Sequence, residues 1–126
     1  MPAQPQPSET ETRRTAMLRT AFDGPVGAAL AAPDTIEILA NPDGSVWVEK
    51  AGYGLRRVSE TLGRAERERI IRLVASSVGE ACDRTSPIVS AELPGSGERF
   101  EGILPPVSEA PCFAIRKPAG QPIALD

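Results

Sequence analysis

Three short apolar runs, separated by turn-forming residues, constrain the fold of this chain more than any other feature. They span Ile88 to Leu93, Phe100 to Leu104 and Cys112 to Ile115. The Pro94-Gly95-Ser96-Gly97 cluster divides the first two, and two β-rich runs around such a cluster predict a hairpin. Pro105-Pro106 cannot donate to a central ladder, so the second strand is expected to end there. The third run then predicts a returning strand.

A second hairpin is predicted upstream. Thr35 to Ala40 alternates polar and apolar residues, Asn41-Pro42-Asp43-Gly44 is a strong turn signal, and Ser45 to Glu49 follows. In this second strand the two valines share one face and Trp47 lies on the other. A lone aromatic residue is not a base-stacking platform, so we interpret Trp47 as a packing residue. Tyr53 to Val58 predicts a third strand, with arginines at its end.

Two regions have helical periodicity. Ser59 to Val78 predicts the longest helix, apolar on one face, with Gly79 as its stop. An earlier helix is expected to begin near Thr15, where apolar residues recur at steps of three and four. Asp23-Gly24-Pro25 interrupts it and predicts a kink, or two short helices with Asp23 capping the second.

These elements predict an α+β fold, with an antiparallel sheet of about six strands packed with two main helices. At 126 residues the chain is expected to form one domain with tails. We expect a disordered tail over residues 1–14, because this polar, proline-containing segment lacks apolar periodicity. The folded domain is expected over residues 15–118, followed by a linker or frayed end over 119–126.

Composition excludes several functions. Fourteen basic and 17 acidic residues give a net charge of −3, which argues against a general nucleic-acid or membrane-surface protein. The chain contains no histidine, so no Ser-His or Cys-His catalytic pair can form. Its two cysteines, Cys82 and Cys112, are not a CxxC pair and are predicted to be free thiols in a reducing compartment.

Nucleotide hydrolysis by this chain is not expected, because a Walker lysine is missing. Lys50 and Lys117 are the only lysines, and neither follows a glycine. The loop Gly95-Ser96-Gly97-Glu98 resembles a phosphate loop only in composition, since it leads into a strand rather than a helix. The carboxylates Glu92, Glu98 and Glu101 are interpreted as surface charge.

Longer stretches carry a family resemblance. The phrases IIRLVASSVG, PIVSAELPGSGERFEGILPPV and APCFAIRKP, in that order, resemble the N-terminal domain of Trb-type conjugal transfer ATPases. These belong to the wider family of type IV secretion and pilus-retraction traffic ATPases. MLRTAFDGPVGAALAAP and the EILANPDGSVWVE hairpin also fit, so the resemblance covers about residues 16 to 118. The family continues into a RecA-like motor domain, whose Walker A loop and acidic boxes have no matching positions here.

The resemblance implies a PAS-like domain within a hexameric, cytoplasmic ATPase peripheral to the inner membrane, which powers DNA or protein translocation. Its partners would be other ring subunits and the secretion or conjugation machinery, without sequence-specific nucleic-acid binding. ATP and Mg²⁺ would bind only in a full-length member, between the two domains. Arg99 in GERFEG and Arg116 in FAIRKP match the arginines that approach the phosphates. No catalytic or metal-binding residue is assigned.

Two other functions stay open at this point. The chain could be a free-standing truncated regulator that binds a full-length ATPase ring, or a small-ligand sensor, which would need a sizeable cavity. Arg84, Arg99 and Arg116 all sit at or near the ends of the last three apolar runs. We expect Arg99 and Arg116 to project from the same side of the sheet, largely exposed and close enough to serve one phosphate group.

Overall fold

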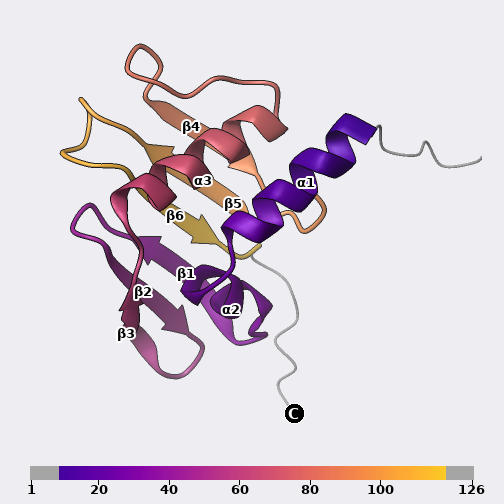
Figure 1. Ribbon diagram of the computed structural model, residues 1–126. Coiled ribbons are helices and arrows are strands. Elements are labelled where there is room, and N and C mark those ends of the chain that lie inside the picture. The colour runs from indigo at the N-terminus through magenta and orange to yellow at the C-terminus, as the bar shows by residue number, and fades with distance from the viewer. Residues whose placement is uncertain (1–8, 119–126) are drawn as a thin grey trace, which may run out of the picture.

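The computed structural model describes residues 9–118, apart from the side chains of residues 11, 14 and 15. Residues 1–8 of the predicted tail and the predicted linker over 119–126 lie outside this range. The elements of Figure 1 are α1 (Glu9–Ala21), α2 (Pro25–Ala31), β1 (Thr35–Ala40), β2 (Ser45–Lys50), β3 (Gly54–Thr61), α3 (Arg64–Ser77), β4 (Ile88–Glu92), β5 (Arg99–Ile103) and β6 (Cys112–Arg116).

The strands form one antiparallel sheet in the order β3-β2-β1-β6-β5-β4. Each half of the sheet is a local meander, built from the hairpins that the turn residues predict. The two halves join where β1 pairs with β6, and Ile38 lies opposite Ile115. The predicted α+β fold with a six-stranded antiparallel sheet is therefore confirmed.

All three helices lie on the same side of the sheet (Figure 1). Helix α3 packs on β4, β5 and β6, α1 packs on α3, and α2 packs on β1, β2 and β3. Between helices and sheet lies one aliphatic core, in which Phe100 stacks on Phe113 with ring centroids 5.2 Å apart. Gly102 lets α3 approach closely, because a Cβ there would lie 2.9 Å from Ile71 Cγ1. Within residues 9–118 no helix covers the opposite face of the sheet.

The structure corrects the predicted N-terminal helices. Helix α1 begins at Glu9 rather than near Thr15, so residues 9–14 are helical and not a tail. The first turns of α1 contribute no buried apolar residue, so a search for apolar periodicity could not detect them. Of the two predicted alternatives at the interruption, two helices form. Asp23 does not cap the second one: Gly24 occupies the N-cap position with φ 98°, and no side chain caps the helix.

The predicted start of the long helix at Ser59 is also wrong. Strand β3 continues to Thr61, which pairs with Ser45, and α3 begins only at Arg64. Toward the end of β3 the backbone N–H and C=O groups find hydrogen-bond partners by pairing with β2, in place of the partners that a helix would have supplied. The predicted stop is confirmed: Gly79 adopts φ 75°, and the N–H of Glu80 donates to the Ala75 carbonyl in a Schellman arrangement.

Arg67, on the first turns of α3, is buried with 3% of its surface exposed. Its guanidinium donates to three backbone carbonyls, those of Pro111 at 2.6 Å, Pro42 at 2.9 Å and Leu62. These acceptors belong to the β5–β6 loop, the β1–β2 turn and the β3–α3 connection. Burial lowers the pKa of Arg67 from its usual value, and the charge of Arg64 lowers it further. Arg67 thus ties together three loops at one end of the sheet.

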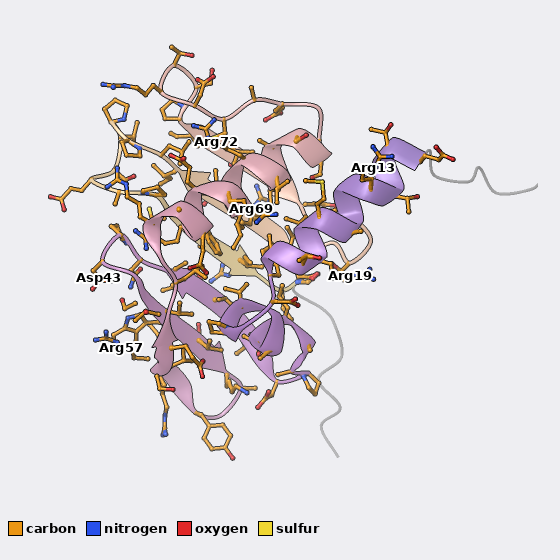
Figure 2. The ribbon with its side chains drawn as sticks, viewed as in Figure 1. Arg13, Arg19, Asp43, Arg57, Arg69 and Arg72 are labelled. Carbon is orange, nitrogen blue, oxygen red and sulfur yellow. The ribbon has the colours of Figure 1, made fainter. Side chains whose placement is uncertain are left out.

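Two further polar contacts hold the ends of the sheet. Asp43, at the tip of the β1–β2 hairpin (Figure 2), accepts hydrogen bonds from the N–H of Ser45 at 2.8 Å and from its hydroxyl at 2.6 Å. The hydroxyl and then the amide of Ser45 lower the pKa of Asp43. After β6, the Lys117 ammonium donates to the carbonyls of Leu30 and Ala32, both at 2.9 Å, and so caps the C-terminus of α2.

Candidate functional site

The uncovered face of the sheet carries two arginines on neighbouring strands. Arg99 opens β5 and Arg116 ends β6, and the two residues lie directly opposite each other in the strand register. Their neighbours in sequence, Phe100 and Ile115, are buried in the core, so strand alternation turns both arginines to the open face. The structure therefore brings the two predicted phosphate-contacting residues together on one side, as expected.

The next strand adds a carboxylate to this pair. Glu37 on β1 lies opposite Arg116, and Glu37 Oε2 is 3.6 Å from Arg116 Nη2. The side chain of Arg116 stays 67% exposed. Glu92 lies opposite Arg99 on β4, yet none of the ion pairs among residues 9–118 includes Arg99. Of the two arginines, Arg116 therefore has a carboxylate paired closely with it.

A shallow surface pocket of about 280 Å³ lies over these residues. It is lined by Glu37, Arg99, Glu101, Ala114 and Arg116. Glu101 accepts a hydrogen bond from the Ser90 hydroxyl at 3.3 Å, which holds its carboxylate toward β4. The small side chain of Ala114 leaves space between the charged groups. An anionic group can therefore approach both guanidinium groups from the open side.

Two like charges lie directly opposite each other in this pair, with Glu37 beyond Arg116 and Glu92 beyond Arg99 in the strand register. Like charges directly opposite each other across two strands destabilise a sheet, because their Cβ atoms lie only about 5 Å apart. Guanidinium forks bind carboxylates and phosphates with two parallel hydrogen bonds, which are stronger than those between neutral groups. An anion bound between Arg99 and Arg116 would relieve the repulsion. The two guanidinium groups are placed to bind one anion between them, in a pocket whose lining also carries the carboxylates of Glu37 and Glu101.

The third arginine of the sequence analysis lies elsewhere. Arg84 follows α3 and lines a separate pocket of about 360 Å³ with Arg64 and Arg72 of that helix. The pair Arg99–Arg116 and Arg84 do not share a pocket. Figure 2 shows Arg72 on α3, which covers the face of the sheet opposite to the paired arginines.

The carboxylates need one correction. Glu92 and Glu101 are exposed, as predicted, whereas Glu98 is 7% exposed and therefore not surface charge. It precedes Phe100 by two residues, and strand alternation directs both toward the covered face. Cys82 is buried and Cys112 half-buried, and both are free thiols. Trp47 is half-buried on the open face, where its indole N–H donates to the Ser45 hydroxyl at 3.1 Å.

Sequence reasoning missed two of these polar residues. Glu37 was not singled out, because it reaches Arg116 only through the pairing of β1 with β6. These two strands are far apart in the sequence, and no turn residues between them indicate that they pair. Arg67 carried a signal: it precedes Ile70, Ile71 and Val74 by three, four and seven residues, which places it on the buried face of α3.

Other site chemistries find no support in the described part of the chain. No group of three or more Asp, Glu, His or Cys side chains there could hold a metal ion. Of the helices between residues 9 and 118, none combines the length and apolar character that crossing a membrane requires.

Known proteins resemble this chain over part of their length. A scan against models of protein families finds no match. A probable conjugal transfer protein TrbB of Sinorhizobium fredii is 39% identical over 109 residues, which cover 86% of this chain and 33% of that protein. A conjugal transfer protein TrbB of Rhizobium radiobacter is 41% identical over 91 residues, covering 72% and 28%. The chain spans about a third of the length of these relatives.

A solved structure shares the fold. The VirB11 ATPase of the Brucella suis type IV secretion system, determined in complex with sulphate, superposes with a TM-score of 0.80 and 24% identity. The match covers 94% of this chain and 35% of that protein. At this level of identity the likeness establishes the architecture, and it agrees with the predicted fold class.

Proposed function

From its homology to the conjugal transfer proteins TrbB, which covers about a third of their length, we propose that this chain is the N-terminal domain of an ATPase. In this proposal the domain forms part of a ring and contacts nucleotide, and the ATPase powers conjugal transfer or type IV secretion. The sequence contains no Walker A motif, so a motor domain must supply the catalytic nucleotide site. ATP and Mg²⁺ belong to that combined site, and the isolated chain is not expected to hydrolyse ATP.

In this proposal, Arg99 and Arg116 contact the phosphates of a nucleotide held by the motor domain. Phosphoryl transfer needs little covalent chemistry from the protein, and catalysis depends on positioning and on charge stabilisation. Both arginines are fixed by paired strands, and the planar guanidinium group can bind phosphate oxygens with two parallel hydrogen bonds. Their role is electrostatic: they stabilise negative charge on the phosphate oxygens when the two domains meet.

One observation carries the proposal: Arg99 and Arg116 lie directly opposite each other on the open face, and Glu37 is the one carboxylate among residues 9–118 that forms an ion pair with either of them. Sheet pairs of like charge are avoided unless something else stabilises them. Residues that break a local rule of this kind are expected at functional sites, where a partner supplies the compensation. Glu37 holds Arg116 over the pocket from one side, while Arg99 keeps its hydrogen-bonding capacity for a ligand.

The test is a chimera that joins this chain to the motor portion of the Sinorhizobium fredii TrbB protein. Arg99→Ala and Arg116→Ala should each lower kcat/KM for ATP roughly 10- to 150-fold, the equivalent of about 1.5–3 kcal/mol for a charge-assisted hydrogen bond. Both substitutions should leave the melting temperature of the isolated domain within about 2 °C, because exposed charges contribute little to stability.

Arg57→Ala is the matched control. Arg57 is an exposed arginine on β3, opposite Trp47 on the same sheet (Figure 2), and it lies outside the pocket of Arg99 and Arg116. Its removal should leave ATP turnover unchanged. If Arg99→Ala and Arg116→Ala unfold the domain, or if they affect turnover no more than Arg57→Ala does, the nucleotide-contact role is wrong.

The same homology supports the partners that we propose: other subunits of the ATPase ring and the conjugation or secretion machinery, in the cytoplasm at the inner membrane. Association should be weak for this chain alone, because the entropy lost on association must be offset by only part of the full interface. Sedimentation of the dilute chain and of the chimera measures this. A stable hexamer of the chain alone would contradict the expectation.

A further inference from the structure

A second pocket lies on the covered side of the domain, away from the paired arginines. It has a volume of about 500 Å³ and is formed where the α1–α2 corner meets the β4–β5 turn. Figure 1 shows that turn beside the end of α1. The volume falls in the range of about 300–1,000 Å³ that is typical of small-molecule sites. Four large apolar side chains line it, those of Leu18, Phe22, Leu30 and Leu93.

One charged side chain in this pocket is buried. Glu98 lines the pocket with only 7% of its surface exposed. Its Oε1 atom is buried and has no hydrogen-bond partner among residues 9–118. None of the ion pairs among the described residues involves Glu98. A buried carboxylate without a partner is costly, so its presence calls for a group that pairs with it.

The remaining charges at the pocket do not supply that group. Arg19 and Asp23 also line the pocket, and both are exposed. Arg19 lies on the last turns of α1 (Figure 2) and pairs with no carboxylate among the described residues. Two carboxylates and one guanidinium leave the lining with a net negative charge. The pocket is therefore complementary to a cation that carries an apolar body.

We propose that this pocket binds a small organic ammonium compound, whose charged nitrogen pairs with Glu98 and whose apolar body lies against Leu18, Phe22 and Leu30. The ammonium group would pair with the Glu98 carboxylate, and a charge-assisted hydrogen bond is about twice as strong as one between neutral groups. The aliphatic and aromatic walls favour a hydrocarbon stem of moderate length over a fully hydrated ion. This site is independent of the nucleotide-contact role, because it shares no residue with the pocket of Arg99 and Arg116.

Three probes of equal length and different charge test the proposal on the isotope-labelled chain: n-hexylammonium, n-hexanol and hexanoate. Amide shifts of Leu18, Leu30 and Ser96 report on the pocket. Hexylammonium should bind saturably, hexanol at least about tenfold more weakly, and hexanoate not at all. Equal binding of the three compounds, or no saturable binding of hexylammonium, overturns the proposal.

Glu98→Gln keeps the size of the side chain and removes its charge. It should weaken hexylammonium binding about tenfold or more, leave hexanol binding unchanged and not lower the melting temperature. Glu92→Gln, an exposed carboxylate on the neighbouring strand, is the control and should change nothing. Ala31→Phe fills the pocket from an exposed position of α2 and should abolish binding of both compounds in a folded protein. Unaltered hexylammonium affinity in Glu98→Gln or in Ala31→Phe contradicts the assigned site.

Discussion

Replacing Arg67 by methionine should destabilise the domain more than any other arginine substitution in α3. The side chain of methionine fills much of the same volume but donates no hydrogen bond, so three carbonyls lose a donor. The carbonyls of Leu62 and Pro111 belong to buried residues. Pro42 is exposed, so its carbonyl can accept a hydrogen bond from water instead. The loss therefore concentrates on two buried acceptors.

The expected magnitude follows from these two groups. Each buried acceptor left without a partner costs about 1–3 kcal/mol, which gives a range of about 2–6 kcal/mol. The variant also avoids the cost of burying a guanidinium, which offsets part of this loss. We expect a decrease of about 3 kcal/mol in the free energy of unfolding, or roughly 12–24 °C in melting temperature for a domain of this size.

Urea unfolding followed by Trp47 fluorescence measures this loss, and Arg69→Met is the control. Arg69 is exposed on the same helix and makes no ion pair among residues 9–118 (Figure 2). Its substitution should cost less than about 0.5 kcal/mol. Arg67→Lys should recover only part of the loss, since a single ammonium group cannot span three acceptors in different loops. The reasoning is refuted if Arg67→Met and Arg69→Met have equal effects.

Three smaller predictions follow from other contacts. Gly102→Ala should cost about 1–3 kcal/mol of stability, because its Cβ would lie 2.9 Å from Ile71 Cγ1; an unchanged urea midpoint would contradict this. Asp43→Asn should lower the free energy of unfolding at pH 7. The difference between variant and parent should vanish as the pH falls through the lowered pKa of the folded Asp43 carboxylate, because protonation removes the same stabilisation from the parent chain. A difference that persists in acid would contradict this prediction. Iodoacetamide should label half-buried Cys112 before Cys82, whose pKa burial raises, and peptide mapping that finds Cys82 labelled first would disprove this.

The strand hairpins could be predicted because turn residues and apolar runs are local signals. The turn at Asn41 to Gly44 and the cluster at Pro94 to Gly97 each join the two strands that the sequence indicated. The start of α3 was misplaced, since Ser59 to Thr61 fit a helical pattern as well as a strand, and only pairing with β2 decides between them. Helix α1 was predicted too short because its first seven residues, ETETRRT, are all polar or charged and leave no apolar signal.

The candidate site was predictable only in part. The common face of Arg99 and Arg116 follows from strand alternation next to Phe100 and Ile115, but their phosphate role rests on the family resemblance. Glu37 joins the site through the β1–β6 pairing, which brings together strands that are far apart in the sequence. The burial of Glu98 could have been predicted from its spacing to Phe100, had the predicted strand been extended by two residues toward the N-terminus.

The most direct test of the nucleotide-contact role is a crystal structure of the chimera bound to a non-hydrolysable ATP analogue. We predict that guanidinium nitrogens of both Arg99 and Arg116 lie within about 2.7–3.2 Å of phosphate oxygens. We also predict that the open face of the sheet turns toward the motor domain. A structure in which the motor domain holds the phosphates alone, with both arginines facing solvent, would contradict the account.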